Sequence, residues 1–284
     1  MEEYQPILSA FFNAPLSKNL LRRGALLFAE GLCAGLLGLY VMHALGIQES
    51  GSISIFLVAA VLVPRFNKLL EENKELIWQS ESLPRRANRL TAYSILALFL
   101  GITSAYALAA IVLGEEALSS GFAFALESAH IGQDTILTRS FGSLPALLSF
   151  NTLVWLAIMV MSFLYRTYGA LLALTWNACV WGLIITFLIL RELESANVTH
   201  FLLFSASTTL ALLPHMAMEA GAYIVAALAA IFFSKGIMKY ATGADEGKQV
   251  FAAVFKLVLI SWLLLLAAAL LESHWAPWIL KSLG

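Results

Sequence analysis

The chain has 284 residues, of which 60% are hydrophobic and only 12% charged, with a formal net charge of -1 and a mean hydropathy of +0.83. Soluble domains are about 45 to 50% apolar and about 25% charged. The composition therefore excludes a soluble enzyme, a disordered tail and a nucleic-acid-binding module with a basic face. Two cysteines, Cys33 and Cys179, are too few for a disulfide framework or a tetrahedral zinc site. We expect an all-α, polytopic integral membrane helical bundle.

Apolar stretches of about 20 residues are predicted to cross the membrane as helices, because lipid offers no hydrogen bonds to a bare backbone. The second stretch is short, so it thins the bilayer, continues into residues 66–70 or pairs with the first as a hairpin. The sixth is too long for one straight span, and Pro214 inside it predicts a kinked, broken or re-entrant helix. About seven spans, or six if the second does not cross, are expected in a single transmembrane domain over residues 1–284: residues 24–47, 50–64, 92–113, 141–165, 168–190, 200–234 and 250–271.

Most of the 17 Lys and Arg residues fall in alternate segments between these spans. Cytoplasmic segments carry an excess of Lys and Arg, so we expect a multi-pass cell-membrane protein with its N-terminus in the cytoplasm and its C-terminus outside. If residues 50–64 fail to cross, the N-terminus moves outside and the remainder keeps its orientation. The bases assigned to the inner side are Lys18, Arg22, Arg23, Arg65, Lys68, Lys74, Arg85, Arg86, Arg89, Arg166, Lys235, Lys239 and Lys248.

The inner segment 65–90 is predicted to form an amphipathic helix that ends near Pro84. Its apolar face is either a docking surface for a cytoplasmic protein partner or, as we favour, a surface lying on the lipid interface. The outer segment 114–140 is predicted to be a solvated, partly helical loop. The apolar face comprises Phe66, Leu69, Leu70, Asn73 and Ile77, opposite Lys68, Glu71, Glu72 and Glu75.

His215 and Glu219 form the leading candidate polar site inside the membrane. They lie four residues apart, on one helix face, directly after Pro214. Ionisable groups in a bilayer are functional candidates by default. A hydrogen-bonded pair at a helix break could relay protons, bind a cation or hold a polar substrate group. The alternative, slightly favoured, is a structural pair that neutralises itself and fixes a bend.

Four further polar residues lie in or beside apolar stretches. Asn177 is predicted to hydrogen-bond a neighbouring helix, or else to line a polar site with His215. Asn151 is predicted to cap the membrane portion of its helix. Glu30, beside two glycines that permit close helix approach, is expected to pair with a polar group of a neighbour, and Glu272 to reach water at the end of the last span. Two ligands do not make a zinc site, so no metal, cofactor or catalytic residue is predicted.

Taken together, several of these residues resemble the stage II sporulation protein M (SpoIIM, DUF95) family. The resemblance rests on Asn151 before an apolar helix and on residues 175–182 (TWNACVWG), 213–219 (LPHMAME) and 267–272 (AAALLE). It is strongest over residues 141–272, and Val63-Pro64 before a charged segment looks like the archaeal members. The sequence departs from the family at Met216, where a glycine usually follows the histidine.

The resemblance implies an integral membrane protein whose sporulating members act with cell-wall hydrolases as an anchor or scaffold. It maps the polar positions shared by the family onto Asn151, Asn177, His215, Glu219 and Glu272. We therefore expect a membrane scaffold or assembly factor for an envelope-associated complex rather than an enzyme. The alternative is a transporter or ion-coupled permease with a midplane His/Glu site. Expected partners are the lipid bilayer, proteins bound through segment 65–90 and further copies of the chain, but no nucleic acid.

Overall fold

The computed structural model describes residues 16–46, 50–78, 84–122, 144–195, 198–239 and 245–283. Six of its helices are long and apolar enough to cross a membrane, which confirms the prediction of an all-α, multi-pass membrane protein. In chain order the elements are α2 (Leu20–Ala44), α3 (Ser50–Trp78), α4 (Pro84–Gly121), α6 (Leu144–Ser195), α7 (Val198–Lys239), α8 (Asp245–Leu270), the π-helix η2 (Leu271–Trp275) and α9 (Ala276–Leu283).

The second span and the segment that follows it are one helix. α3 contains Pro64 and continues to Trp78, and its candidate span covers Gly51–Ile77. The short span predicted to end at residue 64 thus continues through the proline. This agrees with the alternative in which the span extends into residues 66–70. The segment 65–90 is not a separate amphipathic helix, because Pro84 begins α4 instead of ending a helix. Proline suits the first turn of a helix, where its missing N–H has no partner in any case.

The fourth and fifth predicted spans are the two arms of α6. Together they form one apolar stretch, Leu144–Thr186, but the backbone between them is not helical at Arg166, where φ is 52° and ψ is -124°. A Cβ added to Gly169 would lie 2.0 Å from the Met161 carbonyl oxygen, so the chain packs tightly against itself at this turn. The arms match the predicted division of residues 141–165 from 168–190.

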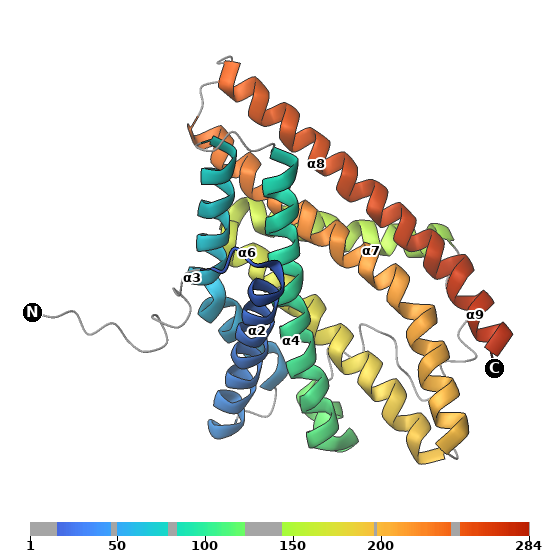
Figure 1. The fold of residues 1–284 in the computed structure, drawn as a ribbon. Coiled ribbons are helices and arrows are strands. Elements are labelled where there is room, and N and C mark those ends of the chain that lie inside the picture. Colours follow the sequence, from blue (N-terminus) through green and yellow to red (C-terminus); the bar gives the residue numbers. More distant parts are fainter. Residues whose placement is uncertain are drawn as a thin grey trace, which may run out of the picture. The chain divides into compact units, whose positions relative to one another are not determined.

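The chain divides into two compact units: residues 1–125 with 171–183, and residues 126–170 with 184–284. In the first unit α2 packs along α4 and against α3, as Figure 1 shows for the dark blue and green helices. A Cβ on Gly31 would lie 2.2 Å from the Leu98 oxygen, and one on Gly101 would lie 2.1 Å from the Phe28 oxygen. The glycines therefore permit the close approach that the sequence predicts for α2.

In the second unit α7 packs along α8, and α9, which continues from α8 through η2, also contacts α7. The Trp155 indole donates to Ser261 Oγ at 2.5 Å, and Ser261 Oγ donates to the Ala222 carbonyl at 2.8 Å. This buried relay joins α6, α8 and α7. Hydrogen bonds between side chains stabilise helix contacts inside membranes, where hydrophobic burial provides little driving force.

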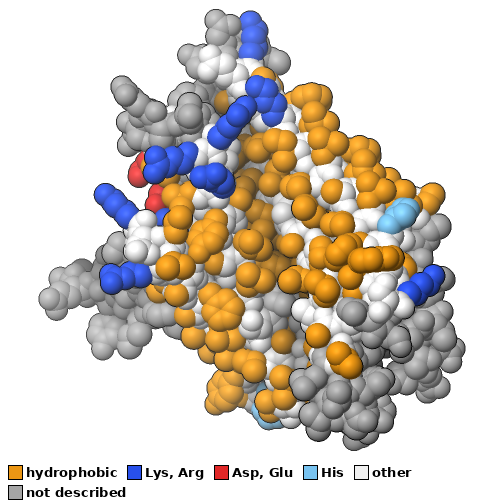
Figure 2. All heavy atoms as spheres, turned by 45° about the vertical axis from the view of Figure 1, so that its right-hand side comes forward, with side chains coloured by type: hydrophobic (Ala, Val, Ile, Leu, Met, Phe, Trp, Pro, Cys, Tyr) orange, Lys and Arg blue, Asp and Glu red, His pale blue; other side chains and the backbone are white. Residues whose placement is uncertain are grey.

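Large apolar side chains cover the outside of the described helices. Phe255 is 69% exposed and Leu213 is 62% exposed. In the candidate span Gly247–Ile279, only 28% of the most apolar stretch is buried. Figure 2 shows a face on which hydrophobic side chains predominate. Soluble monomers rarely expose large contiguous apolar patches, so these helices present the surface expected of helices in contact with lipid.

Candidate functional site

The predicted pair of His215 and Glu219 does not form. The Glu219 carboxylate accepts a 2.5 Å hydrogen bond from Tyr223 Oη, one turn further along α7. His215 is only 7% exposed, and its Nδ1 has no hydrogen-bond partner within the described part of the chain. The spacing of four residues that suggested the pair also joins Glu219 to Tyr223. The sequence prediction chose the wrong neighbour because it overlooked the hydroxyl of a buried tyrosine.

Glu272 lies in the same unit, in the π-helix η2 that follows α8. It is close enough to Glu219 and Tyr223 to interact electrostatically with both. Glu272 is partly exposed, which is compatible with the prediction that it reaches water, and it also contributes a second carboxylate near the first. Single π-turns are rare and are frequent at functional sites, but no sequence signal announces this one.

Pro214 lies within α7, which continues past it as one helix and bends along its length (Figure 1). The helix is therefore kinked, and it is neither broken nor re-entrant. Proline cannot donate to the carbonyl four residues earlier, which here belongs to Leu210. That oxygen accepts a 3.0 Å hydrogen bond from the Trp275 indole in η2. The structure thus identifies the donor that satisfies the carbonyl freed by the proline.

The two asparagines belong to different units. Asn177 belongs to the first unit, where its Nδ2 donates to the Ala173 carbonyl of its own helix at 2.9 Å. That bond is neither of the two predicted roles. Asn151 is 6% exposed and lies inside α6, two turns after the helix begins at Leu144, so it does not cap that helix.

The first unit contains two ion pairs that the sequence reveals only in part. Glu30 and Arg65 are both fully buried, and the guanidinium donates to both carboxylate oxygens, from Nε at 2.6 Å and also from Nη2. Arg23 is 2% exposed and donates to both oxygens of Glu72 at 2.9 and 2.6 Å and to Ser94 Oγ at 2.6 Å. The prediction that Glu30 pairs with a neighbour is confirmed. Its partner was missed because Arg65 was assigned to a cytoplasmic segment.

These pairs are arranged reciprocally on two antiparallel helices. On α2 the base, Arg23, precedes the acid, Glu30, by two turns, and α3 presents Arg65 and Glu72 in the same spacing. Sliding one helix by two turns would bring Arg23 to Arg65, or Glu30 to Glu72. Either shift places like charges together in a medium of low dielectric constant. The charges therefore select one register of α2 against α3, a use for which buried polar groups are well attested.

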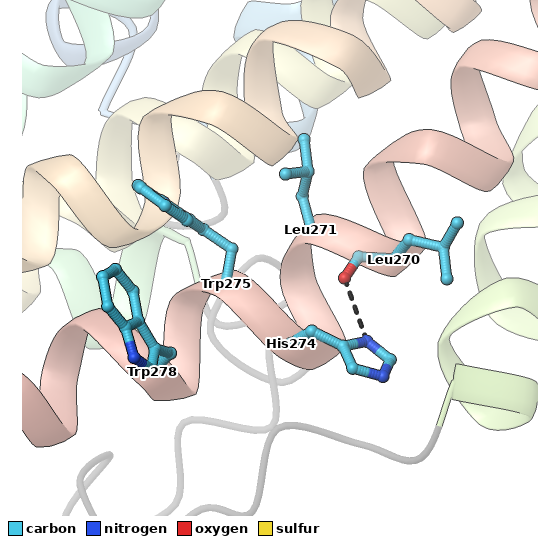
Figure 3. A pocket seen from close by; sticks show the side chains of 5 residues that line it. All are labelled: Leu270, Leu271, His274, Trp275 and Trp278. Atoms are coloured by element: carbon cyan, nitrogen blue, oxygen red, sulfur yellow. Dashed lines mark hydrogen bonds between the residues drawn. The ribbon is translucent and has the colours of Figure 1, made fainter.

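Neither the described clusters nor the described cavity suggests a metal centre. No group of three or more His, Cys, Asp or Glu residues that could hold a metal ion occurs among the described residues. A cavity of about 420 Å³ is lined by Leu270, Leu271, His274, Trp275 and Trp278. Figure 3 shows the two tryptophans together on one side and His274 directed away from them, its Nδ1 bonded to the Leu270 oxygen at 3.2 Å. The lining of the cavity is predominantly apolar.

Comparisons with known proteins do not assign the chain to a family. The sequence matches no protein-family profile, no curated protein and no solved structure.

Proposed function

We propose that this membrane protein is a scaffold or assembly factor for an envelope-associated complex. The observation that carries the proposal is that buried charged side chains of the first unit are paired with charges on neighbouring helices. Glu30, Arg65 and Arg23 each bind a partner on a neighbouring helix with little or no exposure. Such ion pairs hold the helices in a fixed arrangement. Because these side chains bind one another, they are not available to line a polar transport pathway. The resemblance to the stage II sporulation protein M family supports the same role.

The proposed orientation places the N-terminus in the cytoplasm. Two observations within the units support the grouping of bases on which it depends. In the first unit, Arg23 contacts Glu72 and Ser94, so the start of α2, the end of α3 and the start of α4 lie at one end. In the second unit, the Arg166 guanidinium donates to Met238 Sδ, which brings the turn of α6 to the end of α7. Within each unit, these contacts therefore bring together segments whose bases are assigned to the inner side.

The proposed partner surface is the polar face of α3 together with the start of α4. Phe66 and Leu69 are fully buried within the first unit, so the apolar face of this segment is occupied and the polar face is what remains. Its exposed residues are Glu71, Lys74, Glu75, Arg85, Arg86 and Arg89.

A photocrosslinking amino acid at Lys74 tests this surface in native membranes. We expect a discrete crosslinked protein of defined mass from position 74 and none from Leu259, which is 49% exposed on α8. Mutating Glu71 and Glu75 to Lys should reduce the crosslink without lowering the amount of protein in the membrane. Equal crosslinking from both positions would contradict a specific partner surface.

A proton- or ion-coupled permease is the second candidate. It is favoured by the carboxylates of Glu219 and Glu272, the Tyr223 hydroxyl and the unpartnered Nδ1 of buried His215, all in the described part of the second unit. Groups of this kind near a bent helix occur at the midplane sites of transporters.

Replacing Glu219 by Gln separates the two candidates. Gln keeps an oxygen to accept from Tyr223 Oη, so the scaffold predicts a change of no more than about 1 kcal/mol in unfolding free energy. It also predicts that wild-type proteoliposomes acidify no faster than empty liposomes under a pH gradient. Wild-type flux that E219Q abolishes, with the variant still folded, would establish the permease and overturn the scaffold. Tyr223→Phe is the control for loss of the hydrogen bond alone.

A further inference from the structure

We propose that the turn of α6 at Arg166 binds the phosphate of an anionic membrane lipid. Three observations in the second unit carry this inference: the backbone conformation of Arg166, the chemistry of its hydrogen-bond partner, and the aromatic rings and lysines at the same end of the unit. The proposal does not depend on whether the protein is a scaffold or a permease.

The backbone conformation of Arg166 favours glycine. Arg166 is the only non-glycine residue with positive φ in the part of the chain that the structure describes. At φ 52° and ψ -124° a side chain is strained, whereas glycine adopts these angles freely. Strained residues persist where their surroundings hold them, and they cluster at ligand clamps. Because an arginine with these backbone angles lowers the stability of the fold, we look for a role of its side chain.

The Arg166 guanidinium has a poor protein partner. It donates to Met238 Sδ, and the ion pairs of the described residues do not include it. A thioether is a weak acceptor, and a guanidinium carries a permanent charge with five N–H donors. By contrast, Arg23 and Arg65 each bind a carboxylate through two N–H groups. Phosphate oxygens would provide Arg166 with the same bidentate geometry.

The surroundings of Arg166 match the boundary between lipid tails and headgroups. The rings of Phe163, Phe233 and Phe251 pack at centroid distances of 5.6 and 5.7 Å, which joins α6, α7 and α8 in one apolar layer. Basic side chains follow this layer at the same end. A Cβ on Gly236 would lie 2.9 Å from Val250 Cγ1, so the end of α7 and the start of α8 meet there.

That meeting point brings two exposed lysines, Lys235 and Lys248, to the end of the unit where Arg166 lies. Tyr165, beside Arg166, is 58% exposed, and tyrosine is enriched at membrane interfaces. Bases just beyond an apolar layer attract anionic lipids. The geometry therefore favours a lipid phosphate, with acyl chains against the apolar layer, over a phosphate ion free in solution.

The test compares variants of the purified full chain in neutral detergent by thermal unfolding. The probes are phosphatidylglycerol, phosphatidylcholine with matched acyl chains, and inorganic phosphate at the same concentration. Phosphatidylglycerol should raise the unfolding temperature of the wild type by several degrees, and the other two probes should not. Arg166→Gly should unfold at the same or a higher temperature without lipid, because glycine relieves the strain. It should require about tenfold more phosphatidylglycerol for the same shift.

Two further variants complete the test. Arg166→Gln keeps a long polar side chain and should also lose the lipid effect, whereas Arg22→Gln, at an exposed arginine of the first unit, should keep it. Lipid retained in native mass spectra should follow the same order. An unchanged phosphatidylglycerol shift in both Arg166 variants would overturn the proposal. An equal shift from inorganic phosphate would overturn the assignment to a lipid.

Discussion

Replacing Arg65 by Met should destabilise the first unit by about 3 to 5 kcal/mol, the usual cost of leaving one member of a buried ion pair alone. Glu30 is fully buried and receives hydrogen bonds on both of its oxygens from this guanidinium. Without the guanidinium, only the electrostatic attraction of Lys68 remains to compensate the carboxylate, so Glu30 is expected to take up a proton or to move away from the contact. The expected result is a lower unfolding free energy in detergent and less protein in the membrane. Arg22→Met, at a neighbouring exposed base of α2, is the matched control.

Two double variants separate the pair from its individual members. Glu30→Leu with Arg65→Met removes both charges and should recover most of the lost stability, because apolar residues of similar size often replace a buried ion pair at little cost. Glu30→Arg with Arg65→Glu reverses the pair, but it brings the introduced guanidinium within electrostatic reach of Lys68 on α3. The reversal should therefore recover only part of the stability. An apolar double variant less stable than Arg65→Met alone would contradict the pairing.

The limits of sequence prediction in the first unit can be traced to Arg65. Apolar length revealed the spans, and the glycines beside Glu30 revealed that a helix approaches closely. The end of the second span was placed at Pro64 because charge marks the end of a lipid-facing helix. A charge buried between helices obeys a different rule, since its partner lies far away in the sequence. Pairing across 35 residues, from Glu30 to Arg65, cannot be read from spacing on a single helix.

In the second unit the sequence identified the segment of the candidate site but not its contacts. The residues Pro214, His215 and Glu219 carried a local signal, and Glu272 was noted at the end of its span. The pairing of Glu219 with Tyr223 depends on rotamers, which spacing does not determine. The position of positive φ at Arg166 holds neither the glycine nor the asparagine that normally marks such a turn. The π-turn at Glu272 has no sequence signal. Residues 123–143, which include most of the loop predicted for the outer side, lie outside the described residues.

Trp275→Phe should destabilise the second unit by about 2 kcal/mol or more, although it removes only one N–H and little apolar surface. The indole donates at 3.0 Å to the Leu210 carbonyl, which the missing N–H of Pro214 leaves without a helical partner. Lipid cannot replace this donor, because hydrocarbon offers no hydrogen bonds. Trp278→Phe is the matched control: this tryptophan is 59% exposed, and its ring centroid lies 5.4 Å from that of Trp275. Unfolding in a mild detergent with added denaturant measures both.

A double-mutant cycle with Pro214→Ala then assigns the effect to this one carbonyl. Alanine restores an N–H that can donate to Leu210, so the indole becomes redundant. In the Pro214→Ala background we expect Trp275→Phe to cost no more than about 0.5 kcal/mol, which leaves a coupling energy between the two positions of about 1.5 kcal/mol. An equal loss in both backgrounds would show that Trp275 acts through packing alone. If the coupling is found, the bend in α7 and the position of η2 depend on each other, so Glu272 is held near Glu219 by the same contact that satisfies the kink.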